Sequence, residues 1–287
     1  MKIHKKLLVL VMLLMIIIQL IFCGANIPNN KVSKDRLESI KEKGVLVVAS
    51  SNDIPFAYID PKTKEFTGID AEIIREAAKR LGINKVEMKQ IPFNDLLKQL
   101  NTDDSIDIVA DGMYVTDERK KEALFTNILY KESEAIITPK VSKIVFKEDF
   151  KNAVIGAQVG TAFLVLANKW KVEGVVKDVV SFKNQNDLLS AVSTKKIDAA
   201  ITDSIFASYI IFRSNLYLRV LPPTDYTPES PGKIAAAVRK NDITLAKAIN
   251  EKIDEMKYDK TIPEILEKYG LNSSYFVSVT DGHIYLN

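Results

Sequence analysis

Two patterns of apolar residues alternate along this chain. Short stretches such as residues 45–49 (VLVVA) and 153–157 (AVIGA) are apolar throughout or nearly so, as buried strands are. Residues 68–82 instead carry apolar side chains every three or four positions and end on Gly82, which is typical of an amphipathic helix. Strand and helix patterns alternate in this way over most of the chain. The pattern therefore predicts an α/β protein with mostly parallel sheets covered on both faces.

The same reading gives the expected bounds of the other elements. Further strands are expected at residues 86–91 and 106–110, and further helices at 35–43, 94–100, 116–122, 161–171, 241–257 and 261–269.

One short sequence occurs twice in the same structural context. Asn94-Asp95-Leu96-Leu97 leads into the strand pattern at 106–108, and Asn186-Asp187-Leu188-Leu189 leads into the one at 197–199. Each copy is a helix that runs into a strand. The echo predicts two lobes built on one α/β plan.

A length of 287 residues also suits two domains of roughly 100 to 150 residues each. We expect lobe 1 at residues 35–135, lobe 2 at 136–235, a segment at 236–280 that returns to lobe 1, and a tail at 281–287. Extended segments at 134–138 and 233–237 would connect the lobes.

The N-terminus has the layout of a secretory signal. Residues 7–22 contain only one polar side chain, Gln19, and follow a lysine-rich head, which predicts a signal peptide at 1–22. The run is short for a membrane-spanning helix. Residues 20–24 (LIFCG) resemble a bacterial lipobox, although Phe22 stands where Gly, Ala or Ser is usual. We expect a lipid on Cys23 and a polar linker to residue 34; the alternatives are cleavage after Ala25, which discards Cys23, and an uncleaved anchor.

Composition excludes several classes of function. The 40 Lys and Arg residues exceed the 37 Asp and Glu residues only through the lysines of the N-terminal head, so a nucleic-acid partner is not expected. With Cys23 as the single cysteine, and His4 and His283 as the only histidines, a Cys/His dyad, a Ser-His-Asp triad and a Cys-rich metal site are ruled out. We expect no cofactor and no metal.

Open α/β sheets bind ligands beyond the carboxyl ends of their strands, and three such ends carry suggestive groups. Arg119 lies in the first turn of the helix that Thr116 would cap, where the helix dipole favours acids, so it is a candidate for an anionic ligand. Gly160-Thr161 begins a helix with free N–H groups, and Asp203 follows the strand at 197–202. The alternatives are a surface arginine at 119 and an ordinary helix cap at 203.

Taken together, several segments resemble the bacterial extracellular solute-binding proteins of family 3, the polar amino acid receptors of ABC importers. The resemblance runs from about residue 37 to residue 271 and rests on residues 44–48 (GVLVV), 55–58 (PFAY), 68–72 (GIDAE), 116–119 (TDER), 156–161 (GAQVGT) and 198–203 (DAAITD). It implies a two-lobed periplasmic-binding-protein-like (type II) fold, with a ligand cleft between the lobes and a two-strand hinge.

The resemblance also assigns roles to residues of this sequence. It implies that Arg119 binds an α-carboxylate through two parallel hydrogen bonds, helped by backbone N–H groups near Tyr114 and at Thr161 or Ala162. Asp203 and the carbonyl of Gly112 would hold the α-ammonium group. The rings of Phe56 and Phe93 would sandwich the side chain of the ligand; core packing is the alternative for each ring.

Two positions depart from the family pattern. Tyr114 stands where a small Ser or Thr is usual, and Asp53 stands near the place of an aromatic ring. Asp53, together with Asp111, would add negative charge at the side-chain end, which favours a basic or strongly polar amino acid. Asp53 could instead be a turn residue facing water ahead of Pro55.

The expected function is therefore that of a monomeric, lipid-anchored binding protein outside the cytoplasm that passes a polar amino acid to an ABC permease. Secretion without an anchor is the alternative location. There are three rival functions: a receptor for a compatible solute of the ectoine type, an enzyme similar to cyclohexadienyl dehydratase, and a sensor domain. For the enzyme, no carboxylate or lysine stands out as a general acid. For the sensor domain, no second apolar span follows residue 271.

Overall fold

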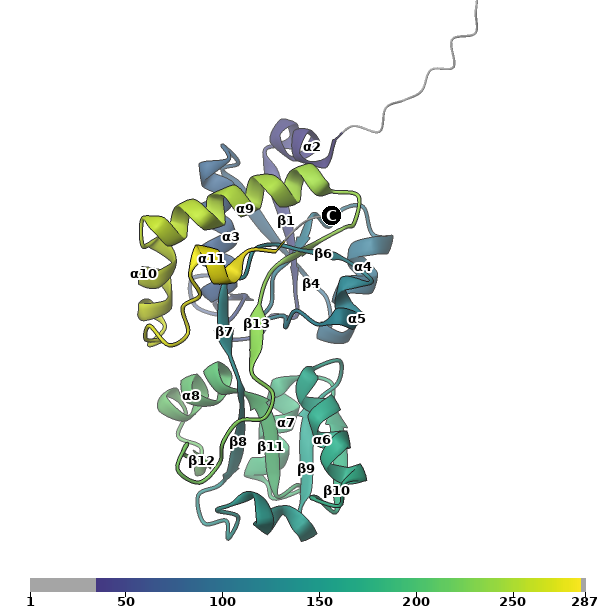
Figure 1. Ribbon diagram of the computed structural model, residues 1–287, viewed down its shortest axis with the longest axis vertical. Helices are drawn as coiled ribbons and strands as arrows, with labels where there is room; N and C mark the ends of the chain where they lie inside the picture. The colour runs from purple at the N-terminus through teal and green to yellow at the C-terminus, as the bar shows by residue number, and fades with distance from the viewer. Residues whose placement is uncertain (1–34, 285–287) are drawn as a thin grey trace, which may run out of the picture. The chain divides into compact units, whose positions relative to one another are not determined.

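The computed structural model describes residues 35–284, which form two lobes connected by a pair of strands (Figure 1). The connecting strands are β7 (Tyr130–Glu132) and β13 (Gly232–Ile234), which pair antiparallel with Glu132 opposite Gly232. This architecture confirms the predicted fold class. The expected signal peptide, Cys23 and the linker lie outside the described residues.

Lobe 1 is built on a five-stranded sheet in the order β4-β1-β5-β14-β6. Its strands are β1 (Val45–Ser50), β4 (Lys85–Gln90), β5 (Ile108–Val109), β6 (Leu124–Phe125) and β14 (Ala237–Val238), with a hairpin of β2 (Tyr58–Ile59) and β3 (Phe66–Thr67). Its helices are α2 (Arg36–Lys43), α3 (Ile69–Arg80), the 3₁₀ turn η1 (Phe93–Asp95), α4 (Leu96–Thr102), α5 (Asp117–Lys120), α9 (Ile243–Tyr258), α10 (Thr261–Lys268) and α11 (Val279–Gly282). Helix α9 packs against α2 and α3, so the C-terminal part of the chain belongs to this lobe.

Lobe 2 is built on a second five-stranded sheet, in the order β10-β9-β11-β8-β12. Its strands are β8 (Glu134–Pro139), β9 (Val154–Gln158), β10 (Asp178–Phe182), β11 (Ala199–Asp203) and β12 (Leu218–Val220). Its helices are the 3₁₀ segment η2 (Lys147–Asn152), α6 (Ala162–Val172), α7 (Gln185–Ser193) and α8 (Ser204–Arg213).

The two sheets share one plan, and each is half antiparallel. Three neighbouring strands are parallel in each lobe, β4-β1-β5 and β10-β9-β11, whereas the remaining pairs are antiparallel. The expectation of mostly parallel sheets was therefore wrong for half of the pairings. The chain crosses into lobe 2 through β7 and β8 and returns through β13 and β14, and β8 and β14 run opposite to the parallel strands beside them.

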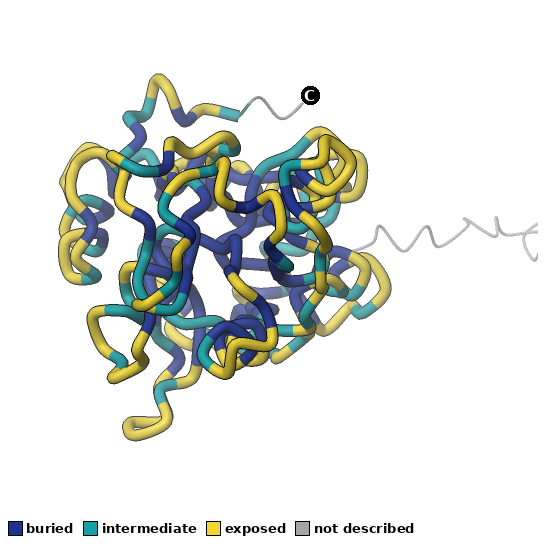
Figure 2. The backbone as a smooth tube through the Cα atoms, turned by 90° about the horizontal axis from the view of Figure 1, so that it is seen from below, coloured by how far each residue is buried: buried dark blue, intermediate teal, exposed yellow. Residues whose placement is uncertain are grey.

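The sequence echo corresponds to equivalent places in the two lobes. Leu96 and Leu97 are buried by α4 ahead of β5, and Leu188 and Leu189 are buried by α7 ahead of β11. Both strands end toward the other lobe, so the loop after β5 and the end of β11 contribute to the same pocket. The tube coloured by burial shows the buried segments gathered inside and the exposed ones around them (Figure 2).

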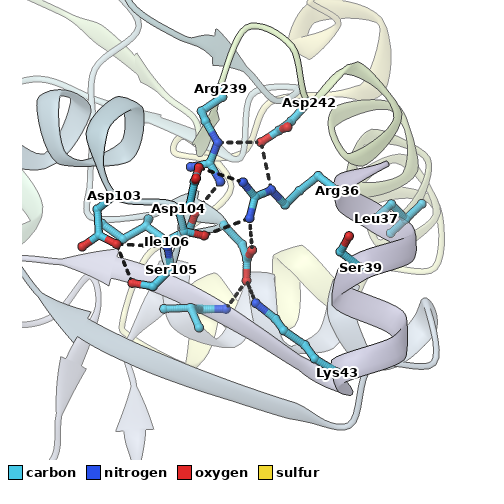
Figure 3. Close-up of polar contacts among 12 residues, drawn as sticks. Arg36, Leu37, Ser39, Lys43, Asp103, Asp104, Ser105, Ile106, Arg239 and Asp242 are labelled. Carbon is cyan, nitrogen blue, oxygen red and sulfur yellow. Dashed lines mark hydrogen bonds and ion pairs between the residues drawn. The ribbon is translucent and has the colours of Figure 1, made fainter. Parts of the chain in front are cut away.

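A buried ion-pair network fixes the start of the described chain to lobe 1 (Figure 3). The fully buried Asp107 carboxylate accepts hydrogen bonds from Lys43 Nζ at 2.7 Å and from the Val47 backbone N–H at 2.9 Å. Arg36 lies between Asp107, at 3.5 Å, and Asp242, at 3.7 Å. Because these groups come from α2, β1, the segment before β5 and the start of α9, the network holds four parts of the lobe together. Within residues 35–284, no helix combines the length and the apolar character needed to cross a membrane.

Candidate ligand-binding site

A pocket lies between the lobes, beside the connecting strands. It is lined from lobe 1 by Asp53, Phe56, Phe93, Asp111, Gly112, Tyr114 and Arg119, and from lobe 2 by Gln158, Thr161, Ala162, Phe163, Gln185 and Asp203. All nine ligand-binding residues expected from the sequence are among them. Every expected residue comes from a strand end, a loop or the first turn of a helix, as the position of the site at the ends of the sheets requires.

Arg119 spans the gap between the lobes. Its Nη1 donates to the Tyr114 carbonyl at 2.7 Å in lobe 1, and its Nη2 donates to the Gly160 carbonyl at 2.8 Å in lobe 2. The guanidinium carbon lies 5.4 Å from the centre of the Phe93 ring, in cation–π contact. Burial lowers the pKa of Arg119 to about 10, although the Asp203 carboxylate favours the charged form. A partly desolvated guanidinium in a pocket is a strong hydrogen-bond donor to a carboxylate.

The helix that carries Arg119 begins as the sequence predicts. The Thr116 hydroxyl accepts a hydrogen bond from the Arg119 backbone N–H at 3.2 Å, which caps α5. Across the pocket, Thr161 caps α6 in the same way through the Leu164 N–H at 3.2 Å. Ala162 is the first residue of α6, where backbone N–H groups have no carbonyl partner within the helix.

Asp203 ends β11 and precedes α8, but its carboxylate does not cap that helix. Its Oδ2 accepts a hydrogen bond from Gln185 Nε2 at 2.7 Å, and Thr202 Oγ1 lies 3.4 Å away. Burial raises the pKa of Asp203 to about 6. The alternative role of an ordinary helix cap is therefore not what the structure shows for this side chain.

A second pair of carboxylates lies at another part of the pocket. Asp111 accepts hydrogen bonds from Ser50 Oγ at 2.8 Å and from the Ser51 N–H at 2.8 Å, and Asp53 is hydrogen-bonded to Ser51 and Gln158. Burial raises the pKa of both acids, and the charge of Asp53 raises that of Asp111 further. Asp53 is thus a half-buried pocket residue and not a turn residue facing open water.

Two aromatic rings of lobe 1 occupy space that is open only because the facing residues are glycines. Gly112 has a φ of +61°, and a Cβ added there would lie 2.9 Å from the Phe56 ring. The Tyr114 ring contacts Gly232 of β13 so closely that no larger residue fits, and it meets the Phe163 ring edge-on with centroids 5.3 Å apart. Tyr114 therefore reaches from lobe 1 along the connecting strands to lobe 2. Phe56 and Phe93 line the pocket and are also buried.

Sequence reasoning missed three polar or aromatic lining residues of lobe 2. Gln158, Phe163 and Gln185 line the pocket, and the two glutamine side chains hold Asp53 and Asp203. Gln158 stands in the segment GAQVGT, which was noted for its glycine and threonine, but Gln185 begins an ordinary helix and carried no signal. Among residues 35–284 no group of His, Cys, Asp and Glu side chains is arranged to hold a metal ion.

Comparison with known proteins agrees with this geometry. The chain is 29% identical to the arginine-binding extracellular protein ArtP of Bacillus subtilis, over 92% of this chain and 98% of that protein. It is 27% identical to the glutamine-binding protein GlnH of the same organism, over 88% and 92%. It also matches the crystal structure of the ancestral amino acid-binding protein AncCDT-1, a precursor of cyclohexadienyl dehydratase, with a TM-score of 0.70 and 28% identity over 82% of this chain and 99% of that one.

A family model covers residues 46–272, most of the described chain. Together with the two lobes and the pocket between them, this match shows that the chain belongs to the bacterial extracellular solute-binding proteins, family 3.

Proposed function

We propose that this protein is the substrate-binding protein of an ABC importer and that it binds an amino acid with a cationic side chain between its lobes. The relatives named above bind arginine and glutamine, which supports an amino acid ligand without deciding its side chain. The charges that line the pocket favour a cationic side chain.

The α-carboxylate would bind at Arg119. The guanidinium already faces the pocket from between two backbone carbonyls, and each of its terminal nitrogens has a second N–H to donate. The N-terminus of α6 at Thr161 and Ala162 lies on the same pocket and adds the positive end of a helix dipole.

The α-ammonium group would bind at Asp203. Gln185 donates to Oδ2 of this carboxylate, and the Gly112 carbonyl lies on the facing wall. Phe56 and Phe93 supply apolar surfaces between the two charged ends.

The Asp53–Asp111 pair is the observation that supports a cationic side chain on the ligand. The lining residues include three acids, Asp53, Asp111 and Asp203, and one base, Arg119. An α-amino acid brings one charge of each sign to Arg119 and Asp203, so Asp53 and Asp111 stay uncompensated. Buried carboxylates without a counter-charge are costly, and a lysine, arginine or similar side chain would compensate them.

Binding without turnover is part of the proposal. The ligand would be enclosed by movement of the lobes about β7 and β13 and released to a permease, because Arg119 bonds to Gly160 only when the lobes are close together. Attachment to the outer face of the membrane through a lipid on Cys23 would keep the protein near that permease; this part rests on residues 20–24 alone.

The test is isothermal titration with arginine, lysine, glutamine, glutamate and ectoine. We expect arginine or lysine to bind most tightly, and recovery of the ligand unchanged after incubation. The Asp53→Asn variant should lose about 10- to 100-fold in affinity for the basic ligand, since a hydrogen bond to a charged group contributes about 1.5 to 3 kcal/mol.

The control is Asp117→Asn, which makes the same charge change at an exposed residue of α5. Tightest binding of glutamate, or an unchanged preference in Asp53→Asn, would contradict a cationic ligand. A ligand recovered as a different compound would contradict binding without turnover.

A further inference from the structure

A carboxyl group of the connecting strand β7 lies directly behind Asp203. Glu132 is only 6% exposed, and its Oε2 accepts hydrogen bonds from the Ser204 hydroxyl at 3.4 Å and the Ile205 backbone N–H at 3.3 Å. These two residues begin α8. Glu132 therefore caps a helix of lobe 2 from the strand that joins the lobes.

The other oxygen of Glu132 has a different environment. No hydrogen-bond donor within residues 35–284 reaches the buried Oε1, and the carboxyl group of Asp203 lies within reach of the Glu132 side chain. Two carboxyl groups can share a hydrogen bond only when one of them carries a proton. A hydrogen bond between these two acids would therefore require one proton.

Glu132 is the member whose surroundings favour the protonated form. Asp203 accepts a hydrogen bond from the amide of Gln185 at 2.7 Å, which favours its ionised form. Burial and the neighbouring charge of Asp203 raise the pKa of Glu132 well above its ordinary value. The sequence did not single out Glu132, because it follows Tyr130 and Lys131 in an ordinary alternating strand.

The surroundings of the pair are mostly acidic or phenolic. The titratable groups that act on its two members are Asp70 of α3, Tyr114 of the loop after β5, Tyr130 of β7, Tyr275 of the C-terminal segment, Asp53 of lobe 1 and Arg119 of α5. Arg119 is the single cation of this set. The charges of Asp70 and Asp53 thus favour a proton at the pair, or a cation in its place, whereas Arg119 opposes it.

Tyr114 has an unpartnered hydroxyl at this end of the pocket. Its ring contacts Gly232, the partner of Glu132 in the β7–β13 ladder, and its buried hydroxyl has no hydrogen-bond partner in the described part of the chain. Asp203 and the Tyr114 hydroxyl could both accept N–H groups from one ammonium ion.

We propose that Glu132 is a positioning residue, which holds a proton against Asp203 in the empty site and releases that proton when the ammonium group of a ligand binds at Asp203. The inference rests on the proposed function in that it requires a ligand with an ammonium group there. On binding, the Glu132 O–H bond breaks, the proton passes to solvent, and the ammonium group of the ligand at Asp203 compensates the negative charge that the proton had compensated. The pair carries one negative charge before the exchange, and the pair plus the ammonium carries one afterwards, so no net charge is added to the buried cluster.

A first test needs no ligand and uses thermal unfolding between pH 4 and pH 8. Glu132→Gln keeps the size of the side chain, an acceptor for Ser204 and Ile205, and an N–H donor for Asp203. The wild-type glutamate ionises in the unfolded chain above a pKa of about 4.3 but stays protonated in the folded protein. The stability that the protonated Glu132 gives to the folded wild type is therefore present at pH 4 and is lost progressively as the pH rises.

Relative to wild type, the Tm of Glu132→Gln should accordingly increase with pH, by about 2 to 4 °C or more at pH 8. The same substitution at the exposed Glu148 is the control and should show no such pH-dependent gain. A difference between Glu132→Gln and wild type that is constant with pH, or a loss of stability at pH 8, would overturn the assignment of the proton.

A second test counts protons during titration with L-arginine at pH 7 to 8.5, in buffers of different ionisation enthalpy. Wild type should release up to one proton more per ligand than Glu132→Gln, because Asp203, Asp53 and Asp111 are common to both proteins and cancel in the comparison. Equal proton release would refute the exchange. Failure of wild type to bind arginine or any other amino acid would count against the proposed function, whereas the melting experiment would still decide where the proton lies.

Discussion

Replacement of Arg119 by alanine is the sharpest perturbation of the proposed site. The side chain contributes in two ways, since it faces the expected α-carboxylate and also joins the lobes through the carbonyls of Tyr114 and Gly160. Arg119→Ala removes both contributions. It leaves the ends of α5 intact, because Thr116 caps the helix through the backbone N–H of residue 119.

The magnitude follows from these contacts. Removal of one partner of a buried, hydrogen-bonded charge pair costs about 2 to 5 kcal/mol, which is about 30-fold to several-thousand-fold in Kd. Loss of the hydrogen bond to Gly160 removes about 1 kcal/mol from the closed form, and the apparent affinity falls with the population of that form. The affinity of Arg119→Lys for the ligand should lie between those of wild type and Arg119→Ala. An ammonium group keeps the charge but lacks the planar guanidinium that can donate to two carbonyls and a carboxylate together.

The assay is isothermal titration with the amino acid that binds wild type most tightly, accompanied by thermal unfolding. A ligand at 100 times its Kd should stabilise wild type by about 2.7 kcal/mol, and the same concentration should stabilise Arg119→Ala little or not at all. Lys120→Ala, at an exposed position of the same helix, should bind like wild type. Full-strength binding by Arg119→Ala in a folded protein would refute the assignment of the carboxylate site.

Four further outcomes are expected. Asp203→Ala should weaken binding by about 2 to 5 kcal/mol, because it leaves the ammonium group of the ligand buried without its counter-charge; wild-type affinity in titration would contradict this. Burial raises the pKa of Asp203 to about 6, so wild-type affinity, measured from pH 8 to pH 5, should fall as the pH drops through that value and the carboxylate that holds the ammonium is neutralised. Asp107→Asn should lower the free energy of unfolding in urea by about 2 to 3 kcal/mol, since it breaks a buried carboxylate away from Lys43 and the Val47 N–H; the control Asp104→Asn, at a nearly fully exposed side chain, should change it little. Cys23→Ser should release the protein from the membrane fraction and abolish labelling by a fatty-acid analogue, whereas membrane retention without any label in wild type would indicate an uncleaved anchor.

Much of the fold follows from local patterns in the sequence. Apolar runs and helical periodicity placed the parallel core strands and the main helices, because side-chain burial repeats with the geometry of each element. The echo of Asn94 to Leu97 at 186–189 indicated two lobes, since the same helix-to-strand unit buries the same leucines in both. The positions of Arg119 and Asp203 at strand ends, combined with the family resemblance, were enough to propose the two charged ends of the site.

The tertiary structure alone decided which groups meet. Gln185 belongs to α7 and Asp203 to the end of β11, and their hydrogen bond depends on how the helix packs on the sheet of lobe 2. Glu132 reaches Asp203 only because the chain crosses between the lobes at β7 and α8 begins beside that crossing. A one-dimensional pattern cannot express such contacts between distant segments, and the protonation of a carboxyl group depends on those contacts and on burial more than on the residue itself. The sequence thus determined the types of charge available to the site, whereas the packing of the two lobes determined their partners and which of them carries a proton.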